Sequence, residues 1–201
     1  MIGRNENNFM TRSGHLWLVA TLIGLLLAGC GKTVELEASK RATDYHTKLQ
    51  RVLVAVNLNR PTMTDTNKNS LMTLAELKVA FDAKWVTPFG VSVELVDLNG
   101  DADDAQKLAA AVSRVHPTQV LELKTAQYIT ASYVIDGYTI DARLSDVAQD
   151  KIVWRTLVSL PPFAKSGRMR SGAFGARVSH QDDANEVVDA LTSQLRVDGL
   201  L

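Results

Sequence analysis

Cys30 carries the most reactive side chain of this sequence, since a thiolate is a strong nucleophile. It is the only cysteine among 201 residues, so no intramolecular disulfide competes for its thiol. Two small residues, Ala28 and Gly29, precede it, and before them lies an uncharged apolar run that begins at residue 16. The sequence therefore places a single modifiable thiol directly behind an apolar segment.

The apolar run has the flanks of an export signal. Arg4 and Arg12 precede it, and Glu6 is the only acid in this region. A cationic start, a short apolar stretch and small residues are typical of a secretory signal peptide. A permanent transmembrane helix needs about 20 apolar residues, more than this run supplies. We expect residues 1–29 to be a signal peptide.

The residues around the thiol, Leu27-Ala28-Gly29-Cys30, resemble the lipobox of bacterial lipoproteins. The resemblance implies that the Cys30 thiol takes a diacylglycerol, that the bond before it is cut, and that the new amine receives a fatty acid such as palmitate. A plain signal anchor with a chance cysteine is the alternative. Gly31 stands where an aspartate favours the inner membrane in enterobacterial lipoproteins. The resemblance therefore implies anchoring to the outer membrane, on its periplasmic face.

The chain left after cleavage has the size of one domain. The whole sequence has 22 basic and 22 acidic residues, and removal of Arg4, Arg12 and Glu6 leaves 20 basic and 21 acidic residues. With basic and acidic residues this nearly equal in number, the chain has no overall electrostatic attraction to nucleic acid. Residues 30–50 are polar, and we expect them to form a lipidated tether with a reach of roughly 65–70 Å. Residues 51–201 are then the single periplasmic domain.

Hydrophobic periodicity predicts the element order β-α-β-α-β-β-β-α. Apolar or alternating runs indicate strands, here over residues 51–58, 91–98, 119–130, 133–144 and 152–160. This order predicts an α/β (α+β) domain in which helices pack on a mixed sheet.

Three helices are expected between and after these strands. The first is capped by Asn69 or Ser70 and ends before Gly90, with one apolar face made of Leu74, Leu77, Phe81 and Trp85. The second is capped by Asp101 or Asp103 and ends at His116-Pro117. The last begins near Gln181, where Ser179 and Asp182 have capping-box spacing.

The domain resembles small outer-membrane lipoproteins with a TolB-amino-terminal-like domain. That group includes curli-assembly lipoproteins and activators of penicillin-binding proteins. The resemblance lies in the element order and in residues 51–58, 150–160 (DKIVWRTLVSL) and 190–201 (ALTSQLRVDGLL). It implies an envelope domain of α/β fold.

Signatures of metal binding and catalysis are not found. No second ligand at helical or hairpin spacing accompanies the histidines His15, His46, His116 and His180. Asp97, Asn99 and Asp101 begin like a calcium loop, but the required glycine and the final acid are replaced by Ala102 and Leu108. A turn with a helix cap accounts for them. We therefore predict no metal and no cofactor.

Four acids cluster in sequence around one hairpin: Asp136, Asp141, Asp146 and Asp150. Asp136 and Asp141 differ by an odd number of positions, so a regular strand points them to opposite faces. An acid/base pair is not implied, and we interpret these acids as lying in solvated turns or edges. With no catalytic residue predicted, the chain is interpreted as not being an enzyme.

Residues 161–180 form a long stretch without periodicity, which in a compact domain indicates function or disorder. This stretch contains no acid, and it carries apolar Phe174 and four cations, Lys165, Arg168, Arg170 and Arg177. A solvated surface loop is one interpretation. The other is a partner-binding loop that uses arginine forks and apolar anchors on an acidic surface.

These features predict a lipid-anchored binding or adaptor domain of the cell envelope. Its expected contacts are the membrane, through the anchor, and another envelope protein, the cell wall or further copies of itself. The alternative is an oligomerising assembly or secretion component at the outer membrane. Entry into lipid would require further amphipathic strands, and the charges of the 119–144 hairpin argue against it.

Overall fold

A mixed sheet forms where the periodicity predicts strands. The computed structural model describes residues 35–37, 39–58, 71–98, 100–131, 134–160 and 180–201, within one unit of residues 33–201. Its strand order is β1-β7-β6-β5-β3-β4, and β2 also pairs with β7; β1 (Glu35–Leu36) and β2 (Lys40–Arg41) are short. The five long strands are β3 (Arg51–Asn57), β4 (Ser92–Asp97), β5 (Gln119–Ala131), β6 (Val134–Asp146) and β7 (Lys151–Leu160).

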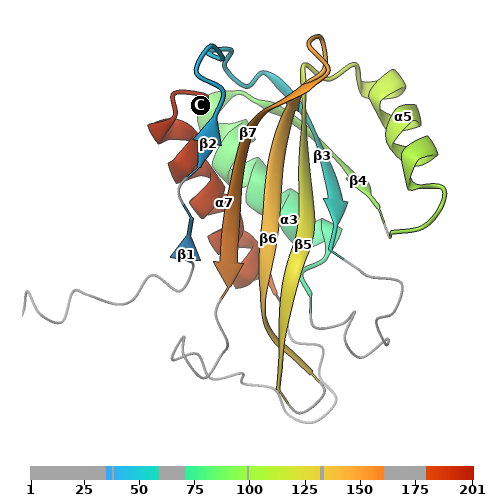
Figure 1. Cartoon of the computed structure of the whole chain (residues 1–201), viewed down its shortest axis with the longest axis vertical. Helices are drawn as coiled ribbons and strands as arrows, with labels where there is room; N and C mark the ends of the chain where they lie inside the picture. The colour runs from blue at the N-terminus through green and yellow to red at the C-terminus, as the bar shows by residue number, and fades with distance from the viewer. Residues whose placement is uncertain (1–34, 38, 59–70, 99, 132–133, 161–179) are drawn as a thin grey trace, which may run out of the picture. The chain divides into compact units, whose positions relative to one another are not determined.

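The pairing explains why the two halves of the sequence differ in character. β3 pairs in parallel with both β4 and β5, so it is a central strand and is buried along nearly its whole length. β5, β6 and β7 follow one another as antiparallel neighbours (Figure 1). The predicted fold class, α/β with a mixed sheet, is confirmed.

The helices follow the predicted order, with one change of cap. α3 (Leu74–Phe81) continues into the π-helical η1 (Asp82–Val86) and α4 (Thr87–Phe89). It begins at Thr73, so the prediction of Asn69 or Ser70 as the cap is wrong. The Thr73 hydroxyl accepts from the Glu76 amide at 3.3 Å, and a Glu76 carboxylate oxygen accepts from the Thr73 amide at 2.8 Å. This reciprocal capping box satisfies two backbone donors and fixes the start of the helix.

The other two helices begin and end close to the predicted residues. α5 (Asp104–Val115) follows Asp103 and ends at His116, which takes a left-handed conformation before Pro117. α7 (Gln181–Val197) begins after His180, without a side-chain cap bond. Ser179, the predicted capping residue, lies outside the described residues.

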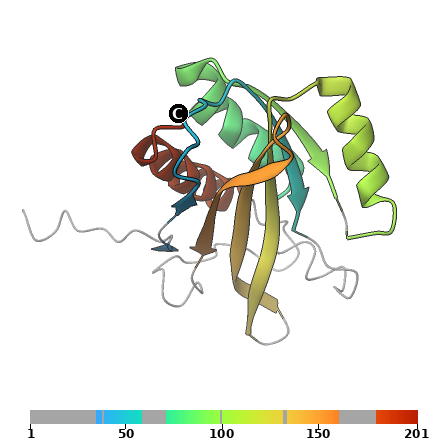
Figure 2. The same cartoon turned by 45° about the horizontal axis from the view of Figure 1, so that its top comes forward.

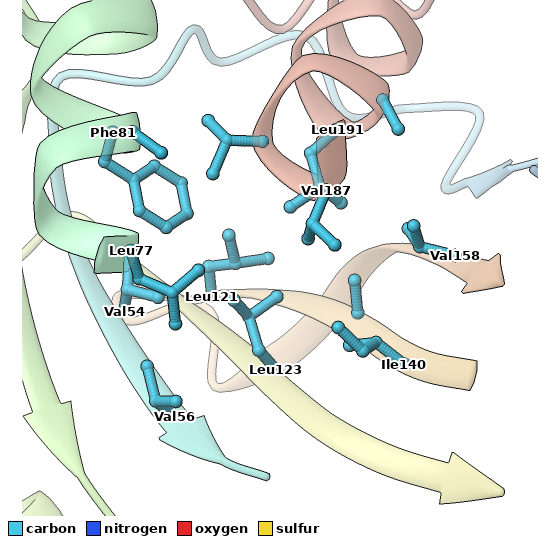
Figure 3. Packing of buried hydrophobic residues seen from close by; sticks show 14 of the residues in the cluster. Val54, Val56, Leu77, Phe81, Leu121, Leu123, Ile140, Val158, Val187 and Leu191 are labelled. Carbon is cyan, nitrogen blue, oxygen red and sulfur yellow. The ribbon is translucent and has the colours of Figure 1, made fainter. Parts of the chain in front are cut away.

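The core lies between one face of the sheet and the helices α3 and α7. Val54 and Val56 of β3, Leu121 and Leu123 of β5 and Ile140 of β6 point toward these helices (Figure 3). Trp154 of β7 is fully buried, and its indole N–H donates to an Asp198 carboxylate oxygen at 2.7 Å. α5 contacts β3 and β4 instead.

The domain begins earlier than predicted. β1 (Glu35–Leu36) and β2 (Lys40–Arg41) both pair antiparallel with β7, and Tyr45 and Leu49 are buried in the core. The expected tether is therefore wrong for the described residues between 35 and 50, and with it the domain start at Arg51; residues 30–34 lie outside the described part of the chain. Two-residue strands are too short to produce a hydrophobic period, so the sequence pattern did not reveal them.

Candidate functional site: the open face of the sheet

One face of β5, β6 and β7 has no described helix or strand packed on it. α3 and α7 lie behind these strands in Figure 1, and Figure 2 shows the same arrangement from a second direction. Successive side chains of a strand alternate between the two faces. The uncovered face, here called the open face, accordingly carries polar and charged side chains such as Lys124, Arg143 and Arg155.

Three cations lie in line across the open face. Lys40 of β2 is the register partner of Arg155 of β7, and Arg155 is the partner of Arg143 of β6. Directly opposite residues in an antiparallel pair point to the same face, with Cβ atoms about 5 Å apart. We call Lys40, Arg155 and Arg143 the cationic row. Like charges placed directly opposite destabilise a sheet, so this row requires compensation.

A single buried carboxylate supplies part of that compensation. Asp141 is 5% exposed and accepts four hydrogen bonds. Arg155 donates from Nε to Oδ1 at 2.7 Å and from Nη2 to Oδ2 at 2.8 Å. Arg143 donates from Nε and Nη2 to Oδ2 at 2.9 and 2.5 Å. Both guanidinium groups are thereby fixed in orientation while their side chains stay 36% and 50% exposed, for Arg143 and Arg155 respectively.

The two arginines also determine the ionisation of Asp141. Burial alone would raise the pKa of this carboxyl. The hydrogen bonds and positive charges of Arg155 and Arg143 outweigh burial, and the net effect is a pKa below the ordinary value. Asp141 is therefore an anion at neutral pH, and it bridges the two arginines.

The cationic row keeps an excess of positive charge. Lys124, the partner of Asp141 across β5 and β6, is exposed, and Glu122 is the partner of Arg143. Among the described side chains of β2, β5, β6 and β7, the open face carries four cations against two carboxylates: Lys40, Lys124, Arg143 and Arg155 against Glu122 and Asp141. The exposed Glu37, whose amide donates to the Leu157 carbonyl at 3.1 Å, adds a third carboxylate beside β7. A guanidinium has more N–H donors than the two that each arginine gives to Asp141, so both retain donors for an external anion.

The interpretation of the hairpin acids as solvated is wrong for two of them. Asp141 and Asp146 are buried, and each accepts hydrogen bonds that offset its loss of water. Asp150 is exposed, in the turn between β6 and β7, where its φ of 48° is left-handed. The side chain of Asp136 lies outside the described residues.

Asp146 belongs to a buried network at the end of the sheet. The Tyr45 hydroxyl donates to Asp146 Oδ2 at 3.0 Å and accepts from Gln119 Nε2 at 3.0 Å. The Gln149 amide donates to Asp146 Oδ1 at 2.9 Å. Burial, the main cause, and the neighbouring carboxylate raise the pKa of Tyr45, although the Gln119 bond opposes them. The network joins the N-terminal segment to β5 and β6.

A pocket of about 360 Å³ adjoins this network, lined by Thr47, Pro117, Thr118, Gln119, Asp146, Val147 and Ala148. Its two most polar side chains are already engaged, since Gln119 and Asp146 bond to Tyr45. We therefore regard the network as structural, and the open face as the stronger candidate for a binding site.

A second correction concerns His180, which the sequence analysis treated as isolated. Its Nδ1 lies 3.1 Å from Asp183 Oδ2, and both side chains are buried at the start of α7. Its backbone N–H donates to Glu76 Oε1 at 2.9 Å, which joins α3 to α7. The i, i+3 spacing of His180 and Asp183 was readable in the sequence. No cluster of three potential metal ligands occurs among the residues that the structure describes.

The sites predicted from the sequence are not among the residues that the structure describes. Cys30 and the partner-binding loop residues Lys165, Arg168, Phe174, Arg170 and Arg177 are outside the described residues. Within the described part of the chain, none of the helices has the length and apolar character needed to cross a bilayer. The i, i+2 spacing of Asp141 and Arg143 within a predicted strand was the one available signal for the open face. The position of Lys40 on the open face depends on the pairing of β2 with β7, and β2 is too short to be recognised from the sequence pattern.

Comparisons with known proteins give no family. No family model and no curated protein matches the chain. Two solved structures that resemble it are PelC dodecamers from Paraburkholderia phytofirmans. The first, of a point variant, is 14% identical, covers 84% of this chain and 98% of that chain, and has a TM-score of 0.43. The second is 16% identical, covers 81% and 93%, and has a TM-score of 0.41. Likenesses as weak as these carry no conclusion about function.

Proposed function

We propose that this chain is a lipid-anchored envelope protein whose non-catalytic domain binds an acidic envelope component through its open face. The cationic row is the observation that supports the proposal. Three cations are aligned by strand register, and only one buried carboxylate bridges two of them. An external anion would relieve the remaining repulsion and use the free guanidinium donors.

The anchor in this proposal is Cys30, from the lipobox resemblance, and the compartment is the periplasmic face of the outer membrane. Charge complementarity of this kind mainly accelerates and orients encounter. Such a binding role requires no catalytic centre. The fixed guanidinium groups suit it, because little side-chain entropy is lost when they bind.

Photo-crosslinking in intact cells tests the proposal. Ile152 pairs with Ser145, two residues along β6 from Arg143, so a photoreactive residue at Ile152 reports on the open face. Val79 of α3 is a matched control, since the two side chains are 54% and 58% exposed. We expect adducts from position 152 and few from position 79. Equal capture of envelope molecules, lipids included, from both positions, or none from position 152, would contradict a binding role for the open face.

The oligomerising component remains the second candidate, and one observation favours it. β4 ends the sheet order on its side, so its outer edge has no strand partner among the described residues. An exposed edge can pair with a strand of another chain. The mass of the detergent-solubilised protein, measured by light scattering, separates the two: the binding domain gives a monomer, and the assembly component gives a multiple of it.

A further inference from the structure

The route from the anchor to the domain is short. Glu35 begins β1, and it is five residue positions after Cys30 in the sequence. Fully extended, that step spans at most about 18 Å. If Cys30 carries the lipid, as the proposed function holds, the edge of the sheet formed by β1 and β7 lies within that distance of the bilayer surface. The former expectation of a long tether would have allowed the domain to reach far from the membrane.

The cationic row lies on this same edge region. Lys40 is five residues along the chain from Glu35, and β1 and β2 both pair with β7, the strand that carries Arg155. A surface with an excess of cations is thus held next to a membrane by a covalent link. Anionic phospholipid headgroups attract basic residues that lie within about a Debye length of them.

The side chains between the cations also suit a lipid surface. Ile152 is exposed on the open face, and Leu157, the register partner of Asp141, is half-buried there. Aliphatic side chains beside basic ones are typical of surfaces that lie in the headgroup region. The residues that line the pocket at the Tyr45 network do not include those of the cationic row. The open face therefore offers a pleated surface with exposed cations for a phosphate-bearing layer.

We infer that the acidic component bound by the open face is the anionic phospholipid surface in which Cys30 is anchored. The inference rests on the proposed function and names its partner. The lipid anchor holds the protein at the membrane, and the cationic row then orients the domain with its open face toward the phosphates. α3 and α7, on the opposite side of the sheet, are thereby presented to the periplasm.

Site-specific fluorescence on the full-length lipidated protein tests the orientation. Because the only native thiol is consumed by the anchor in this account, Ile152→Cys or Val79→Cys supplies a unique site for a fluorophore. Each labelled protein is reconstituted into phosphatidylcholine vesicles, with or without phosphatidylglycerol, that carry a headgroup quencher. We expect stronger quenching at position 152 than at position 79 when phosphatidylglycerol is present. The difference should vanish without it, and also at high salt.

Charge removal makes the test quantitative. Lys40→Gln/Lys124→Gln leaves the Asp141 bonds intact. Each cation near an anionic surface contributes a factor of about five, so the ratio of face-down to other orientations should fall about 25-fold. Lys78→Gln/Lys84→Gln removes the same charge from α3 and η1, where these lysines pair with Asp82 and Asp189, and should leave the ratio unchanged.

The outcomes separate the inference from the proposed function. The lipid assignment is overturned by equal quenching at both positions in phosphatidylglycerol vesicles. It is also overturned if the Lys40→Gln/Lys124→Gln substitutions leave the quenching at position 152 unchanged. If position 152 nevertheless crosslinks a protein or a glycan in cells, the binding role stands and its acidic partner is that molecule. If position 152 gives neither quenching nor crosslinks, both proposals fall.

Discussion

Lys40 and Arg155 are direct register partners across β2 and β7, although both side chains are cationic. The register is held from the other face of β2. Ser39 donates its hydroxyl hydrogen to Asp198 Oδ2 at 2.5 Å, the Arg41 guanidinium donates to the Asp198 carbonyl, and Trp154 donates to the same carboxylate. Contacts with the end of α7 therefore maintain a pairing that charge repulsion alone would disfavour.

Asp141→Asn tests the compensation within the cationic row. The substitution removes the negative charge that accepts from Arg143 and Arg155, and we expect it to lower the free energy of unfolding by about 1–3 kcal/mol at neutral pH. Because the pKa of Asp141 is lowered in the folded state, its contribution is complete above the unfolded value of about 3.9 and is lost as pH falls through the folded value.

Denaturant unfolding at several pH values measures both effects. The wild type should lose stability on acidification below about pH 4, and Asp141→Asn should lose less over the same interval. Asp150→Asn is the control: Asp150 is exposed at a left-handed position that asparagine tolerates. A pH dependence that is identical in wild type and Asp141→Asn would refute the role of this carboxylate.

Trp154→Ala tests the join between β7 and the helices. Loss of a fully buried indole should cost about 3–5 kcal/mol through lost burial and a residual cavity. Trp154→Phe keeps most of the apolar volume and removes the N–H that donates to Asp198, so its cost should be smaller, about 1–3 kcal/mol. Chemical denaturation compares the three proteins, and an unchanged midpoint for Trp154→Ala would show that the side chain does not stabilise the core.

The fold was predictable where apolar residues repeat, and the open face was not. The buried run of β3 and the alternation in β6 and β7 both report burial, so their positions agree with the structure to within two residues. The cap at Thr73 was readable from its spacing to Glu76. β1 and β2 depend on pairing with β7, and Tyr45 bonds to Asp146 of β6, in each case more than a hundred residues away. No local pattern encodes such contacts.

Cys30→Ala tests the anchor. Because the lipid would be attached only through this thiol, the variant should fail to incorporate labelled fatty acid and should keep its signal peptide. In wild-type cells, membrane fractionation should recover the protein with the outer membrane. Fatty-acid incorporation into Cys30→Ala would rule out the lipoprotein assignment, whereas recovery with the inner membrane would overturn the location alone.

The partner-binding loop gives an independent prediction. Replacement of Lys165, Arg168, Arg170 and Arg177 by Gln should leave thermal stability nearly unchanged, because exposed charges contribute little to it. If the loop recognises an acidic partner, capture of that partner should weaken and its dependence on salt should flatten. Equal capture by the quadruple variant and wild type across a salt series would make the loop a solvated connector.

Recognition of an acidic component by the open face is tested by the crosslink yield from position 152 in cells after charge reversal of that face. Lys40→Glu/Lys124→Glu places two acids beside the cationic row and leaves the bonds of Asp141 in place. We expect the yield of adducts from position 152 to fall at least tenfold, while Lys78→Glu/Lys84→Glu leaves it unchanged. The same yield from all three proteins would contradict recognition of an acidic envelope component by the open face.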